Sequence, residues 1–290
     1  MSRLVRWLSR RPLWLLHVWG GWLGRISHAL SPSYRRRFAD NTRLAGVSAS
    51  AARPAIAEAG RLVAELPYLW LRPAEQPIGP SLQWQGLDVI DAAHAQGRGI
   101  VYLTPHLGCF EVTAQALAER FGASHGPITV LYRPARQAWL RELMDGARAR
   151  PGLATAPATL AGVRQMIRAL RRGESVGLLP DQVPPEGMGV WAPFFGKPAY
   201  TMTLAARLVQ QTGAVPLLIW GERLPRGAGY VVRVETLGEP LPDDPAAQED
   251  AAAVINRAME RLILKCPQQY LWGYNRYKAP RRQETADAPG

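Results

Sequence analysis

The sequence predicts an α/β fold with a mainly parallel central sheet flanked by helices and a membrane-associated helix at the N-terminus. Short apolar runs alternate with helical patterns across residues 99–264. A strand that is followed by a helix and another strand favours parallel pairing, with helices on both faces. We assign residues 1–30 to the anchor helix, 31–280 to one α/β domain, and 281–290 to a flexible tail.

The anchor assignment rests on the basic and aromatic character of the N-terminus. The net charge is +12, and residues 1–43 contain nine arginines and one acid, Asp40. Tryptophans lie among these arginines, a combination that favours a bilayer interface. The apolar stretch 12–24 has about 13 residues, whereas a span needs about 20. We therefore expect a helix that lies in the interface or inserts shallowly; a helix docked on the core is the alternative.

Other classes of partner fit this composition less well. Nucleic-acid binding would use the same basic segment, but its arginines are interleaved with tryptophan in an apolar run. Cys109 and Cys266 lack metal-ligand spacing, and a disulfide framework is not expected in a chain of this length. No small-residue cleavage site marks a signal peptide. We expect a cytosol-facing body without a metal or cofactor.

The expected elements follow in chain order. Helical patterns come first, then a loop rich in proline and glycine near residues 73–80. Strands are predicted from short apolar runs at 99–104, 128–132, 175–180, 214–220 and 230–235. Helices are predicted at 31–46, 48–71, 111–121, 137–149, 160–173, 201–212 and 247–264. The helix at 160–173 has a basic polar face that could attract phosphates or an acidic carrier protein, or could simply be solvated.

His106 follows directly after the predicted strand 99–104 and Pro105. Ligands of open α/β sheets bind beyond the carboxyl ends of strands, so His106 occupies a favoured place for a catalytic loop. Glu111 lies five residues later, about 140° around a helix from its starting face. We therefore expect a loop-to-helix pair in which Glu111 fixes the tautomer and His106 acts as general base. The alternative is a half-buried loop histidine beside a solvated acid.

A second candidate region covers residues 177–218. It begins at a strand end with Asp181 and Gln182, and continues through a Pro/Gly loop to the apolar block WAPFFG. An apolar wall with a few polar groups suits a pocket for an amphiphilic ligand. An ordinary surface loop is the alternative, although exposing these aromatic side chains to water would be unfavourable.

Several stretches together resemble the late (lauroyl/myristoyl) acyltransferases of bacterial lipid A biosynthesis, within the lysophospholipid acyltransferase-like group. They occur in family order and are TPHLGCFE, LYRPARQAWL, GARARPGL, MIRALRRGESVGLLPDQ, GVWAPFFGKPAYT and PQQYLWGYNRYK. The resemblance covers roughly residues 95–280. It implies that His106 is the catalytic base and Glu111 its partner in the family's His-x-x-x-x-Asp/Glu motif.

The resemblance also implies residues that bind the substrate. Arg133 and Arg148, with Arg150 beside it, match family arginines that could hold phosphate bidentately. Asp181 occupies the family's Asp-Gln position. The C-terminal stretch WGYNRYK departs from the family, which usually has His or Arg before the last arginine; we interpret this as tuning of the acceptor.

The implied activity is transfer of a fatty acyl chain from an acyl carrier protein thioester to a hydroxyl of a phosphoglycolipid, the lipid A precursor. His106 would remove the hydroxyl proton, and no covalent enzyme intermediate would form. Cys109 as a nucleophile is disfavoured, because a cysteine here more often fills a core. The expected location is the cytoplasmic face of the bacterial inner membrane, in contact with its lipids. Alternatives are a lysophospholipid, ornithine lipid or other glycolipid acceptor, or a non-catalytic lipid-binding relative.

Overall fold

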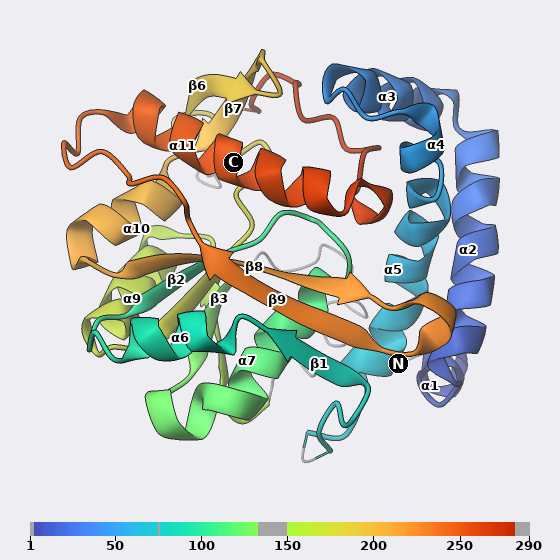
Figure 1. Ribbon diagram of the computed structural model, residues 1–290, viewed down its shortest axis with the longest axis horizontal. Helices are drawn as coiled ribbons and strands as arrows, with labels where there is room; N and C mark the ends of the chain where they lie inside the picture. Colours follow the sequence, from blue (N-terminus) through green and yellow to red (C-terminus); the bar gives the residue numbers. More distant parts are fainter. Residues whose placement is uncertain (1–2, 75, 133–149, 282–290) are drawn as a thin grey trace, which may run out of the picture.

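A seven-stranded sheet forms the centre of the molecule (Figure 1). The computed structural model describes residues 3–74, 76–132 and 150–281. The strand order is β1-β9-β8-β2-β5-β3-β4, and only the β8–β9 pair is antiparallel. The strands are β1 Leu82–Gln85, β2 Ile100–Leu103, β3 Ile128–Tyr132, β4 Leu153–Pro157, β5 Ser175–Leu178, β8 Val215–Arg223 and β9 Tyr230–Thr236. The predicted mainly parallel sheet is confirmed.

Helices cover both faces of this sheet. They are α6 Leu87–His94, α7 Phe110–His125, α9 Leu160–Arg171, α10 Leu204–Thr212 and α11 Gln248–Lys265. Side chains of α9, α10 and α11 pack with Val101 and Leu103 in one core. Side chains of α6 and α7 pack with Ile100 and Tyr102 in the other. Consecutive residues of a strand point to opposite faces, so β2 is buried on both sides and reads as an unbroken apolar run.

Some elements were not anticipated. Strand β1 (LQWQ) and β4 (LATAP) lie at the two edges of the sheet and have short, weakly apolar sequences. The WAPFFG block belongs to an antiparallel hairpin, β6 Gly189–Phe194 and β7 Lys197–Met202, which packs on α11. Phe195 and Gly196 turn it, with positive φ at both positions. The predicted helix 137–149 lies outside the described residues.

The N-terminal part folds as a helical layer at the edge of the molecule (Figure 1). Its helices are α1 Arg3–Ser9, α2 Leu13–Leu30, α3 Pro32–Leu44, α4 Ala49–Ala52 and α5 Ala55–Trp70. The anchor predicted as one helix over 1–30 is two helices, with Pro12 preceding the second. Among the described residues, no helix has both the length and the apolar character needed to cross a bilayer.

Helix α2 docks on α5 through glycines. A Cβ placed on Gly60 would lie 2.0 Å from the carbonyl oxygen of Gly20 and 2.4 Å from the backbone nitrogen of Gly24. The two backbones therefore approach as closely as only glycine permits. The helix thus packs on the domain, as the alternative prediction had it, while its opposite face stays exposed and apolar. Contact of that face with a membrane stays a prediction.

Candidate active site

His106 and Asp181 meet at the carboxyl ends of two neighbouring parallel strands. Strands β2 and β5 pair in register from Ile100 opposite Ser175 to Leu103 opposite Leu178. Each functional residue follows its strand by three positions, so the two reach the same edge. His106 Nδ1 lies 2.7 Å from Asp181 Oδ1, and the His106 backbone N–H donates to Asp181 Oδ2 at 2.9 Å. One buried carboxylate thus holds both the ring and the main chain of His106.

This contact determines which ring nitrogen of His106 is free to act as a base. Burial works to raise the pKa of Asp181, but the charge and hydrogen bonds of His106 hold that pKa below its ordinary value. An ionised Asp181 accepts the Nδ1–H, which leaves a lone pair on Nε2. The Gln182 side-chain nitrogen lies 3.0 Å from His106 Nε2 and donates to it. Nε2 is therefore the basic atom, covered by an amide.

The structure corrects the predicted pairing of His106 with Glu111. Asp181 and Gln182 occupy the two ring nitrogens, so neither is left for Glu111. Glu111 lies in the first turn of α7, as expected, and its carboxylate accepts a hydrogen bond from Trp70 Nε1 at 3.2 Å. The orienting role belongs to Asp181, whose position was noted in the sequence but not its partner. A catalytic part for Glu111 stays a prediction.

The C-terminal stretch supports both loops of the site. The Leu271 backbone N–H donates to the His106 carbonyl at 3.2 Å, and the Val183 N–H donates to the Tyr274 hydroxyl at 3.0 Å. Tyr274 is one of the residues by which WGYNRYK departs from the family pattern. Because its hydroxyl accepts a hydrogen bond from the chain two residues after Asp181, Tyr274 supports the loop that carries Asp181.

An apolar cavity lies beside the histidine, between α7 and strands β2, β3 and β5. Its empty volume is about 680 Å³, counted out to the mouth. The Phe110 ring contributes to the lining and also contacts the His106 ring, with 4.9 Å between centroids. The rest of the lining includes Trp70, Tyr102, Glu111, Leu117, Ile128, Val130, Leu131, Leu153, Leu178 and Ile219. The cavity thus brings apolar volume next to the base.

The aromatic block that was predicted to wall this pocket packs elsewhere. Phe194 contacts Phe195 and Tyr277, and Phe195 contacts Trp272. These rings join the hairpin to the C-terminal stretch. From the predicted region it is the strand end, at Leu178 and Leu179, that lines the cavity.

The predicted phosphate-binding arginines are only partly described. Arg133 and Arg148 lie outside the described residues. Arg150 is buried, and its guanidinium donates to the carbonyls of Leu69 at 3.0 Å and Pro73 at 3.2 Å. It therefore satisfies carbonyls at the C-terminal end of α5, which is an internal structural role.

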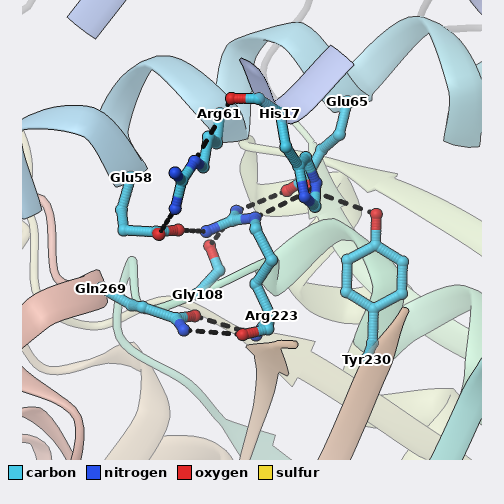
Figure 2. A network of polar contacts seen from close by, with 8 residues as sticks. All are labelled: His17, Glu58, Arg61, Glu65, Gly108, Arg223, Tyr230 and Gln269. Atoms are coloured by element: carbon cyan, nitrogen blue, oxygen red, sulfur yellow. Dashed lines mark hydrogen bonds and ion pairs between the residues drawn. The ribbon is translucent and has the colours of Figure 1, made fainter. Parts of the chain in front are cut away.

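A buried ion-pair network lies behind the loop that carries His106 (Figure 2). Arg223 contacts Glu58 at 2.6 Å and Glu65 at 2.5 Å, and it also donates to the Gly108 carbonyl at 3.3 Å. The other residues in the network are His17, Arg61, Tyr230 and Gln269. It connects the N-terminal layer to the loop that carries His106. Removing one member of such a network leaves buried charge uncompensated, typically at a cost of about 3–5 kcal/mol.

The same network makes Cys109 unsuitable as a nucleophile. Its side chain is fully buried. Burial first, and then the charge of Glu65, raise the pKa of the thiol well above its ordinary value. A protonated, inaccessible thiol is a weak nucleophile, which agrees with the interpretation of Cys109 as a core residue.

Glu65 makes the stability of the fold depend on pH. Burial acts to raise its pKa, but Arg223 and His17 outweigh burial and lower it from 4.5 to about 2. The stabilisation is present above the unfolded-state value and is lost as the pH falls toward the folded-state value. We expect the free energy of unfolding to fall by about 3 kcal/mol over this range through Glu65 alone.

Denaturant unfolding between about pH 6 and pH 2 measures this effect. The Glu65→Gln variant should be less stable at neutral pH and should lack this part of the acid loss. If the free energy of unfolding fell equally at low pH in the variant and the wild type, the assignment to Glu65 would be contradicted.

The geometry can be compared with known proteins. The sequence profile described as "Bacterial lipid A biosynthesis acyltransferase" matches residues 48–279. The chain belongs to this family. The match contains the His106–Asp181 pair and the residues that line the cavity, so the features described above are parts of the family's domain.

Characterised relatives from Escherichia coli (strain K12) are similar over most of this chain. The lipid A biosynthesis lauroyltransferase is 30% identical over 67% of this chain and 60% of its own length. The palmitoleoyltransferase is 28% identical, again over 67% of this chain and 60% of its own length. The myristoyltransferase is 27% identical over 86% of this chain and 77% of its own. The chain thus spans about 60% of the length of the first two relatives.

Proposed function

We propose that this protein transfers a fatty acyl chain from an acyl thioester to a hydroxyl of a lipid A precursor. The observation that carries the proposal is the base atom Nε2 of His106, held by buried Asp181 beside an apolar cavity. The family match and the names of the relatives, which specify lauroyl, palmitoleoyl and myristoyl groups, support a fatty acyl donor.

The proposed reaction uses His106, Asp181 and Gln182. The acceptor hydroxyl displaces the Gln182 amide and donates its proton to His106 Nε2 as the oxygen attacks the thioester carbonyl. The tetrahedral intermediate then collapses, the C–S bond breaks, and the departing sulfur takes the proton from the imidazolium. Asp181 stabilises that imidazolium and keeps its Nδ1–H in place. General base catalysis of this kind contributes roughly 10²–10⁴ in rate.

The cavity beside the base suits the acyl chain. Its lining is mainly Leu, Ile, Val and aromatic side chains. Burying methylene groups there stabilises the bound donor by about 0.8 kcal/mol each. Glu111 contributes to the lining of this cavity. Arg133 and Arg148 stay candidates for the acceptor's phosphates on the strength of the resemblance.

We further propose that α2 lies on the cytoplasmic surface of the inner membrane, where an acyl carrier protein delivers the donor. Large apolar side chains recur about every four residues along its outer face. They are Trp14, Val18, Trp22, Ile26 and Leu30, each 48–78% exposed. An amphipathic helix with such a face binds in the plane of the interface. The basic outer face of α9 is a candidate surface for the acidic carrier.

Membrane binding through α2 is testable with one double variant. Trp14→Ser/Trp22→Ser should lower binding to phospholipid vesicles at least tenfold, because burying one large apolar side chain contributes roughly 1.5–3 kcal/mol. Trp191→Ser is the control, since Trp191 is 49% exposed on the distant hairpin. Vesicle sedimentation measures the effect, and equal binding by the double variant and the wild type would exclude α2 as the anchor.

Mass spectrometry of the lipid product tests the proposed reaction. Purified protein is incubated with an acyl carrier protein thioester and the lipid A precursor, and the precursor should gain one acyl group. Parallel reactions offer a lysophospholipid, an ornithine lipid or another glycolipid, and acylation of one of these alone would identify a different acceptor. Tight lipid binding without acylation of any acceptor would favour the non-catalytic alternative and contradict the proposal.

A further inference from the structure

The N-terminal layer contains a second opening, which is lined by basic side chains, whereas the acyl cavity is lined mainly by apolar ones. It is a cleft between α2 and the α4–α5 junction, with an empty volume of about 1130 Å³ counted out to its mouth. Its titratable lining consists of Arg25, His28, Arg53 and Arg61, without any carboxylate. Burial, and then Arg35, lower the pKa of His28, so the positive charge of the cleft comes from the arginines.

Two of these guanidinium groups converge on one point. A methyl group built on Gly21 would lie 3.6 Å from Arg25 Nη1 and 3.6 Å from Arg61 Nε. Both distances run to the same point, so Arg25 Nη1 and Arg61 Nε lie within about 7 Å of each other. An anion between them would relieve the repulsion of the two charges. Two contacts fix the Arg61 side chain in this position: it pairs with Glu58, and it donates to the His17 carbonyl at 3.3 Å.

The cleft is not neutralised by the protein itself. Glu58 pairs with both Arg61 and buried Arg223, so one negative charge faces two positive charges. Across residues 3–74, 76–132 and 150–281, neither Arg25 nor Arg53 forms an ion pair with a carboxylate. No carboxylate of the described residues therefore offsets the charge of these two exposed arginines, which stay available to an outside anion.

The position of the cleft identifies the kind of anion. Arg25 lies between Trp22 and Ile26 on α2, and its guanidinium is 5.7 Å from the centroid of the Trp22 ring. Trp22 and Ile26 are 61% and 51% exposed and belong to the apolar face that we place on the membrane. The cleft therefore adjoins that apolar face. A helix that lies in the interface would hold these arginines near the level of the lipid phosphates.

We propose that this cleft binds the phosphate of an anionic membrane phospholipid, with the lipid's acyl chains alongside Trp22 and Ile26. Arginine suits this ligand because its guanidinium donates two parallel hydrogen bonds to phosphate oxygens. The bound headgroup would fix the orientation of α2, and hence of the whole domain, on the bilayer. The inference rests on the proposed membrane contact of α2 and is independent of acyl transfer.

Vesicle sedimentation tests the site against general charge attraction. The cleft variant is Arg25→Gln/Arg53→Gln, and the matched control is Arg10→Gln/Arg36→Gln, which removes two exposed arginines of the same layer outside the cleft. Diffuse attraction to an anionic bilayer changes affinity roughly fivefold for each arginine, and the control pair measures it. On phosphatidylcholine vesicles containing phosphatidylglycerol, the cleft variant should lose at least about tenfold more affinity than the control. Equal losses would overturn the proposal.

A second experiment distinguishes a lipid headgroup from a free anion. Short-chain phosphatidylglycerol below its micellar concentration should raise the melting temperature of the wild type and of the control, but not of the cleft variant. Inorganic phosphate at the same concentration should have a much smaller effect. An equal rise with inorganic phosphate would identify a free-anion site and overturn the lipid assignment. Neither readout uses acyl transfer, so failure of the proposed reaction would leave both results interpretable.

Discussion

His106→Ala should lower the rate of acyl transfer by roughly 10²–10⁴, because the group proposed to accept the hydroxyl proton is removed. The KM for the acyl donor should change little, since the cavity that holds the acyl chain stays intact. The initial rate of product formation, followed by mass spectrometry, measures the effect. His125→Ala is the control, because His125 is exposed at the opposite end of α7. Turnover of His106→Ala close to that of the wild type would exclude His106 as the base.

Asp181→Asn should lower kcat by a similar order, about 10²–10⁴, although the side chain keeps its size. An amide at this position can donate to His106 Nδ1, which favours the tautomer with the proton on Nε2 and blocks the base. It also removes the charge that stabilises the imidazolium. Because neither change touches the acyl cavity, KM should stay within a few-fold of the wild type.

The Asp181 prediction has a matched control in Asp243→Asn, which makes the same chemical change at an exposed position. Circular dichroism of each variant checks the fold. If Asp181→Asn reduced affinity for the donor and left kcat unchanged, Asp181 would be a binding residue, as its position in the family resemblance first indicated, and not the partner of His106.

Much of the site's framework was predictable because parallel strands have a clear sequence pattern. The buried run at 99–104 and the location of His106 beyond it were predicted and are confirmed. The partner of His106 was not identified, because the nearest acid in sequence, Glu111, lies on the helix that leaves the site. Asp181 is 75 residues away. The order of the strands in the sheet decides which loops lie side by side, and that order cannot be read directly from one sequence.

A signal for the correct partner was nevertheless present. Strand β2 continues as Leu103-Thr104-Pro105-His106, and β5 continues as Leu178-Leu179-Pro180-Asp181. Two strands that end in the same Leu-x-Pro pattern, each followed by a polar residue, place those residues at equal distances from the sheet edge if the strands are neighbours. The observed register fulfils this condition.

The N-terminal segment shows the limit of arguing from composition. Tryptophan and arginine content indicated an interface but not the second face of the helix. Gly20 and Gly24, four residues apart, were the signal for close packing on α5. The buried network could not be predicted, because Glu58 and Glu65 find their partner Arg223 more than 150 residues later.

A double-mutant cycle on acyl transfer tests the central claim, that Asp181 acts through His106, most directly. The turnover of wild type, His106→Ala, Asp181→Asn and the double variant is measured at high enzyme concentration with one donor and one acceptor. If Asp181 acts only through the ring of His106, Asp181→Asn should cost little once His106 is alanine, so the two effects should be strongly non-additive. Additive losses, with Asp181→Asn as damaging in the alanine background as in the wild type, would contradict the account.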